Sequence, residues 1–195
     1  MKYYFFIFLL LPYYVLGQDL EFVKQARPPC QHELVSLYEL AQLDSVSTEQ
    51  MKKAYEHALE YYQADIEKHC GLYTDIESNF IKEIIIKSKN EEYVSYFFEY
   101  LKATKGSAGE GRSYNLEELF QQYPNRVVKL AKEESGEFIA NLVHHIAWGY
   151  LNNTYPESKT NPIEKFWTRH TKLDSPELKN SQFVAEVIEQ IKKYR

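Results

Sequence analysis

Histidine is the side chain best suited to acid–base chemistry and metal binding near neutral pH. Two of the six histidines are adjacent, at His144 and His145. They lie in a stretch whose apolar residues recur with helical spacing. Since neighbours on a helix point about 100° apart, the two imidazoles cannot face one ligand, and at most one edges the core. This pattern predicts either one histidine and Trp148 beside a groove, or a core-edge histidine bonded to a backbone or tyrosine group. Gly149 would let another helix approach closely.

Metal binding is the second chemistry that histidines could provide. His57 and His69 lie on one predicted long helix, with Asp65 four residues before His69. The apolar stripe passes near His69 but not His57, so the two do not converge. Helical zinc sites are marked by HExxH or by ligands at i and i+4 with others elsewhere, and neither HExxH nor a repeated ExxH occurs. We therefore expect no metal ion and no cofactor.

Catalytic signatures are missing as well. The chain has no GxSxG elbow, and its glycine-rich segment lacks the GxxxxGK[ST] pattern of a phosphate loop. A carboxylate pair can still be assembled by the fold alone, so an exported hydrolase built around His144, His145 and nearby glutamates stays an alternative. The helical carboxylates interpreted as solvated faces are Glu56, Glu60, Glu117, Glu118, Glu133, Glu134 and Glu137.

Aromatic residues are the most abundant candidates for a binding surface. Beyond residue 17 lie 13 of the 17 Tyr, 8 of the 11 Phe and both Trp. The segment 93–101 is aromatic on more than one helical face, so it is either central to the core or presents an apolar face to a partner. Tyr and Trp suit protein interfaces because they combine apolar area with a polar tip. The predicted partner-binding residues are Tyr93, Tyr96, Phe97, Tyr100, His144, His145 and Trp148.

The N-terminus indicates where these residues work. Lys2 precedes an uninterrupted apolar run over 3–16, closed by Gly17, which is the layout of a secretory signal peptide. The run is shorter than the roughly 20 residues that span a bilayer. An uncut N-terminal anchor or a buried helix is the alternative. We expect residues 1–17 to be removed, giving a periplasmic or extracellular protein with no stable membrane anchor.

The two cysteines, Cys30 and Cys70, agree with an oxidising destination, and we expect them to form a disulfide. A pair of buried thiols is the alternative. The chain of 195 residues has 28 acidic and 23 basic residues, a formal charge of −5. No Lys/Arg cluster marks a nucleic-acid surface, and mild acidity favours cationic partners.

Helical periodicity extends over nearly all of the remaining chain. We expect an all-α fold, an antiparallel array of about seven or eight helices, either a bundle or a small α-solenoid. No motif recurs at a fixed period. Segment 84–101 is predicted helical, with a short β-hairpin as the alternative because it is rich in strand formers. Helices are predicted to start near Gln31, Ser47, Thr74, Asn115, Pro124, Gly136, Asn161 and Ser175.

One loop interrupts the helices, at 105–112, where three of the seven glycines fall and flexibility is expected. Residues 18–195 are therefore predicted to form a single helical domain carrying this loop. From export, aromatic content and missing catalytic motifs, we expect a non-enzymatic protein that binds a macromolecule, in the manner of an inhibitor or immunity protein. The partner is expected to be another protein.

Overall fold

The computed structural model describes residues 23–27, 30–68, 70, 75–104, 110–153 and 161–194. Within these ranges the regular structure is entirely helical, which confirms the all-α prediction, with ten α-helices where seven or eight were expected. The helices are α2 (Cys30–Ala41), α3 (Thr48–Lys68), α4 (Ile76–Ser88), the 3₁₀ turn η1 (Glu91–Tyr93), α5 (Val94–Ala103), α6 (Glu110–Gln122), α7 (Pro124–Lys132), α8 (Glu137–Asn153), α9 (Pro162–Arg169), α10 (Pro176–Lys179) and α11 (Gln182–Lys193).

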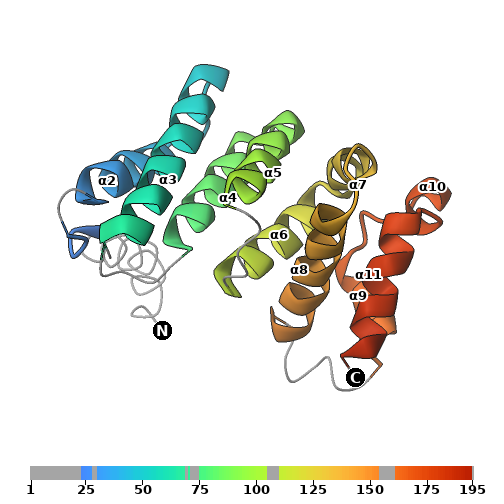
Figure 1. The fold of residues 1–195 in the computed structure, drawn as a ribbon. Coiled ribbons are helices and arrows are strands. Elements are labelled where there is room, and N and C mark those ends of the chain that lie inside the picture. Colours follow the sequence, from blue (N-terminus) through green and yellow to red (C-terminus); the bar gives the residue numbers. More distant parts are fainter. Residues whose placement is uncertain are drawn as a thin grey trace, which may run out of the picture.

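The helices stack across the molecule in chain order, from α2 and α3 at one end to α10 and α11 at the other (Figure 1). Helix α2 packs on α4, α4 on α6, and α6 on α8. In the same way α3 packs on α5, and α5 on α7. Alternate helices therefore form two layers, as in an α-solenoid, where each unit contacts mainly its neighbours.

Segment 84–101 is helical, and the hairpin alternative is not found there. Helix α4 ends because Lys89 adopts a left-handed conformation with φ 51°. Asn90 then restarts the chain as a helix, since its side chain accepts a hydrogen bond from the Glu92 backbone N–H at 3.1 Å. Most of the strand-forming residues on either side, among them Ile84, Ile85, Val94, Phe97 and Phe98, are core residues of α4 and α5.

Side chains cap the backbone at some of the predicted helix starts. Ser47 and Gln50 form the expected capping box, at 3.2 and 2.8 Å. The single helix expected from Ser175 is instead two, since Ser175 caps only the four-residue α10 and Ser181 accepts from the Val184 N–H to start α11.

Two predicted segments fall wholly or partly outside the described residues. The signal peptide over 1–17 lies outside them, as do residues 105–109 of the glycine-rich loop. The last three loop residues, 110–112, belong to α6, which begins five residues before the predicted start at Asn115.

The disulfide prediction is confirmed: Cys30 and Cys70 are bonded, with Cα atoms 5.9 Å apart. The bridge joins the first residue of α2 to the segment after α3. The Cys70 backbone N–H also donates to Asp65 Oδ1 at 2.9 Å, and its carbonyl accepts from Arg27 N–H at 3.1 Å. A disulfide is consistent with export. Among the described helices, none has the length and apolar character needed to cross a bilayer.

Helices α6 and α8 lie closest together where Gly149 faces Ser113, which confirms the expected close approach. A Cβ atom on Gly149 would lie 2.7 Å from the Ser113 carbonyl carbon and 3.1 Å from Glu117 Cβ. The first of these is backbone and cannot rotate away. Glycine is therefore required at this position.

Gly149→Ala is expected to lower the free energy of unfolding by about 3 kcal/mol, because overpacking outweighs the gain of roughly 1 kcal/mol in helix propensity. Gly136→Ala is the contrast. Gly136 has a φ of 63° but open space around it, so only backbone strain of about 1 kcal/mol is expected. Urea denaturation of both variants checks this. A cost at Gly149 no larger than at Gly136 would contradict the close approach.

Candidate functional site

Four of the seven predicted partner-binding residues are core residues. Tyr93, Phe97, Tyr100 and His145 are all 5 % exposed or less. Burial places them between helices, since the aromatic segment 93–101 packs against α3, α4 and α7. Of the seven, only Tyr96, His144 and Trp148 are partly exposed and can belong to a partner surface. Sequence periodicity could not separate the two groups, because this helix is aromatic on more than one face.

The first partly exposed aromatic group lies where α3 meets α5. Tyr55 and Tyr96 pack with ring centroids 5.9 Å apart, and Tyr96 also contacts Tyr93 at 6.2 Å. Burial and the charges of Glu99 and Glu56, two exposed carboxylates, raise the pKa of Tyr55. We call Tyr55, Tyr96, Glu56 and Glu99 the tyrosine face.

The second aromatic group lies on the other layer. Trp148 of α8 packs on Tyr114 of α6 with centroids 5.4 Å apart. His144 is hydrogen-bonded to the Tyr194 hydroxyl near the C-terminus. Only His145 faces the core, as the helical spacing predicted. The bond to a tyrosine, expected for the core-edge histidine, is made by His144 at the surface.

The buried member, His145, lies with its Nδ1 2.7 Å from Ser113 Oγ. A serine hydrogen-bonded to a histidine is also the arrangement of an activated nucleophile. Here, however, Ser113 and His145 are 3 % and 2 % exposed, and Ser113 lies at the close contact of α6 with Gly149 of α8. A substrate cannot reach that hydroxyl in this conformation, so the pair joins α6 to α8.

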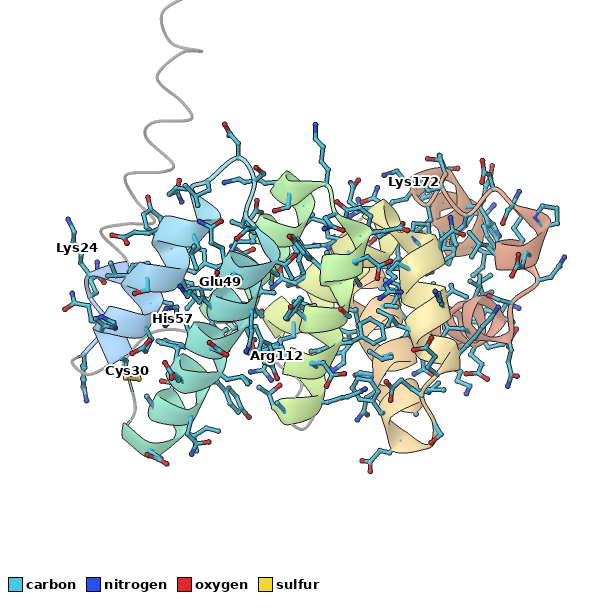
Figure 2. All side chains as sticks on the ribbon, turned by 90° about the horizontal axis from the view of Figure 1, so that it is seen from above. Lys24, Cys30, Glu49, His57, Arg112 and Lys172 are labelled. Carbon is cyan, nitrogen blue, oxygen red and sulfur yellow. A yellow bond between two sulfur atoms is a disulfide. The ribbon has the colours of Figure 1, made fainter. Side chains whose placement is uncertain are left out.

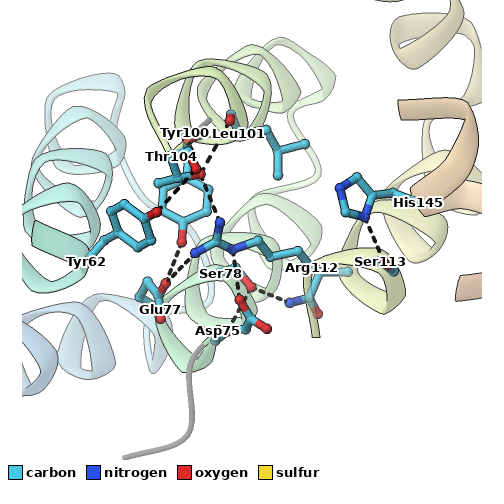
Figure 3. Close-up of polar contacts among 11 residues, drawn as sticks. Tyr62, Asp75, Glu77, Ser78, Tyr100, Leu101, Thr104, Arg112, Ser113 and His145 are labelled. Carbon is cyan, nitrogen blue, oxygen red and sulfur yellow. Dashed lines mark hydrogen bonds and ion pairs between the residues drawn. The ribbon is translucent and has the colours of Figure 1, made fainter. Parts of the chain in front are cut away.

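An arginine that the sequence did not single out lies at the centre of the array. Arg112 is 2 % exposed, and its Nε lies 2.8 Å from Asp75 Oδ1. Its Nη2 is 3.4 Å from Glu77 Oε1, and its Nη1 donates to Thr104 Oγ1 at 3.0 Å (Figure 3). One guanidinium thus joins α4, α5 and α6.

Aromatic rings enclose the same guanidinium. Its carbon lies 4.9 Å from the centre of the Tyr62 ring and 5.2 Å from that of Tyr100. The Tyr100 hydroxyl donates to Glu77. Burial raises the pKa values of Asp75 and Glu77 even with Arg112 beside them, although the arginine opposes that rise. The group is a buried ionic network, which we call the Arg112 network.

A second buried carboxylate, Glu117, contradicts its interpretation as part of a solvated face. Its side chain is fully buried. Arg169 binds it in a bidentate manner, with Nε 2.8 Å from Oε1 and Nη2 3.0 Å from Oε2. Asn153 Nδ2 donates to Oε2 at 3.1 Å, and His170 Nε2 lies 3.2 Å from Oε1. Although burial alone would raise it, the His170 and Arg169 contacts lower the pKa of Glu117 to about 2.

The Glu117 group does not favour the hydrolase alternative. His170 lines a shallow hollow of about 300 Å³ with Trp167 and Asp174. Its Nδ1 is 3.0 Å from the Phe166 carbonyl oxygen and its Nε2 is 3.2 Å from Glu117 Oε1, so each ring nitrogen already has a protein oxygen nearby. A carboxylate held ionised by three neighbours is a poor proton carrier near neutral pH. The group ties α6 to the ends of α8 and α9.

Comparison with known proteins adds no assignment to this geometry. No family model matches the chain, and no curated protein or solved structure matches it either. The fold and its clusters define an all-α protein of stacked helices with buried ionic networks. Any function must therefore be argued from the accessible residues.

Proposed function

We propose that this is an exported, non-enzymatic binding protein that holds a cationic segment of another protein on its tyrosine face. Residues 1–17 act in this proposal as the secretory signal, and the product works in the periplasm or outside the cell. The role is that of an inhibitor or immunity protein, in which binding itself is the activity. The observation that carries the proposal is the packed Tyr55–Tyr96 pair, partly exposed and flanked by Glu56 and Glu99.

The chemistry of this face suits arginine and lysine side chains. A guanidinium can stack on a tyrosine ring while it forms ion pairs with carboxylates. Glu56 and Glu99 are paired on the surface with Lys52 at 3.6 Å and Lys102 at 3.0 Å. Exposed pairs of this kind contribute less than about 1 kcal/mol, so a partner's cation can replace the lysines at little cost. The acidic composition of the chain supports the same class of partner.

The Tyr114–Trp148 group is the weaker candidate surface. His144, which lies four residues before Trp148 on α8, is already hydrogen-bonded to the Tyr194 hydroxyl. The Tyr114–Trp148 group is therefore the matched control for the tyrosine face.

A photo-reactive phenylalanine analogue placed at position 96 tests the proposal. In the exported fraction of the source organism it should crosslink a protein through a peptide rich in Lys and Arg, and high salt should suppress the crosslink. The same analogue at position 148 should not crosslink that protein. A partner captured equally at 148, or through an acidic peptide, would exclude the tyrosine face.

With the partner in hand, Tyr96→Ala should weaken its affinity about 30-fold, the effect of losing a central aromatic anchor worth roughly 2 kcal/mol. Tyr114→Ala should change it less than about 3-fold, since scattered peripheral contacts contribute little. Isothermal titration calorimetry on the mature chain gives both values. Equal losses in the two variants would contradict this assignment of the surface.

A further inference from the structure

A separate cluster of side chains lies between the first two helices, near the disulfide. Glu33 belongs to the first turn of α2, while His57 and Glu60 are three residues apart on one side of α3. His57 and Cys30 lie at the same end of the array, far from Lys172 at the other end (Figure 2). Helices α2 and α3 pack directly on each other, so the contact is part of the fold.

The three side chains converge closely enough to share an ion. Each offers one ligand atom, and these atoms all lie within 4.8 Å of one another. His57 Nδ1 is 2.5 Å from Glu33 Oε2 and 3.8 Å from Glu60 Oε2. The atoms around a tetrahedral zinc are about 3.3 Å apart at normal zinc–ligand distances, so Glu33 must retreat by less than about 1 Å.

The charges of the cluster favour a cation. Glu33 and Glu60 are two carboxylates beside one histidine. Two neighbouring carboxylates repel each other unless a proton or cation lies between them. Glu60 is well exposed and His57 is partly exposed, so an ion can enter from solvent.

The exposed histidine next to Glu33 in sequence contacts one oxygen of its carboxylate. His32 Nδ1 lies 3.2 Å from Glu33 Oε1, which leaves Oε2 facing His57. Partners of this kind, behind the ligands, orient the atoms that bind a metal. The ligand type also selects the ion, because an imidazole with two carboxylates suits zinc, whereas calcium requires six or more oxygens.

We propose that Glu33, His57 and Glu60 form a zinc site that clamps α2 to α3, with water as the fourth ligand. This goes beyond the proposed binding function and does not depend on it. It also departs from the sequence-based expectation of no metal. That expectation considered ligands along one helix, whereas Glu33 comes from the neighbouring helix.

Competition between the mature protein and a chromophoric zinc chelator tests the site. The wild-type chain should bind one zinc ion, and zinc should raise its melting temperature because it binds only the folded state. His57→Ala and Glu60→Gln should each weaken binding at least 10-fold. His144→Ala, a partly exposed histidine on α8, should leave the affinity within about 2-fold, as expected of a distant, independent site.

The Glu60→Gln variant guards against a fold defect, because Glu60 is well exposed and circular dichroism without zinc should match the wild type. Bound Co²⁺ gives a second readout, since intense visible d–d bands mark a four-coordinate site. Wild-type affinity no greater than that of His57→Ala and Glu60→Gln would overturn the proposal. Loss of binding in His144→Ala as large as in His57→Ala would overturn it as well.

Discussion

Replacing Arg112 with Met is expected to lower the free energy of unfolding by about 3–5 kcal/mol, the usual cost of breaking a buried ion pair from one side. Methionine fills the aliphatic part of the arginine side chain but ends short of the guanidinium carbon, so contact with the Tyr62 and Tyr100 rings is weakened. What is lost is the cation facing Asp75 and Glu77, both almost fully buried. Urea denaturation of the mature chain at pH 7 measures the loss.

Two further measurements show how much of the lost stability comes from the unpaired carboxylates and how much from lost packing. Adding Asp75→Asn and Glu77→Gln to Arg112→Met removes the uncompensated carboxylates, and at least half of the lost stability should return. Lowering the pH should also restore part of the stability that Arg112→Met loses. The pKa values of both carboxyl groups are raised in the folded protein, so Arg112→Met should approach wild-type stability as the pH falls and they become neutral. A triple variant as unstable as the single one would contradict the ionic explanation.

Glu117→Gln is the second substitution expected to have a large effect, about 3 kcal/mol at pH 7 from the lowered pKa alone. The pKa falls from the ordinary 4.5 to about 2 in the folded protein. Glu117 therefore stabilises the fold fully above pH 4.5, and this contribution is lost as the pH falls toward 2. The stability difference between wild type and variant should shrink across that window, while other groups cancel in the comparison.

Glu118→Gln is the matched control for Glu117→Gln, one residue further along α6. Glu118 is partly exposed and pairs with Lys82 at 2.9 Å. Lys82 is only 6 % exposed, but it keeps a second partner, Glu83 at 2.6 Å, so a smaller loss of stability than that of Glu117→Gln is expected. If Glu117→Gln loses as little stability as Glu118→Gln, and that loss does not change with pH, then Glu117 does not stabilise the contact between α6 and α9.

Local patterns were sufficient to predict most of the helices. The capping box at Ser47 and the helical spacing around Leu142–Tyr150 depend only on residues within one or two turns, and both are found. Gly149 could also be assigned a packing role, because glycine inside a strong helix requires a reason. The disulfide followed from the presence of only two cysteines in a chain with an export-like start.

Long-range charge contacts could not be predicted in this way. Arg112 looked like the end of a glycine-rich loop, and only its contacts with Asp75, 37 positions earlier, explain why α6 starts so early. Glu117 looked like a surface carboxylate because its partner Arg169 is 52 residues away. The sequence offered two hints: a lone arginine after three glycines, and an acidic residue beside apolar Leu116.

Stacking in chain order has a consequence for how the protein is made. Each helix rests mainly on helices that precede it closely in the sequence, so the contacts are local and the relative contact order is low. Such topologies fold quickly, since few long loops must close before contacts form. The helices can therefore fold in order from the N-terminal end, because each new helix can pack on helices that are already formed.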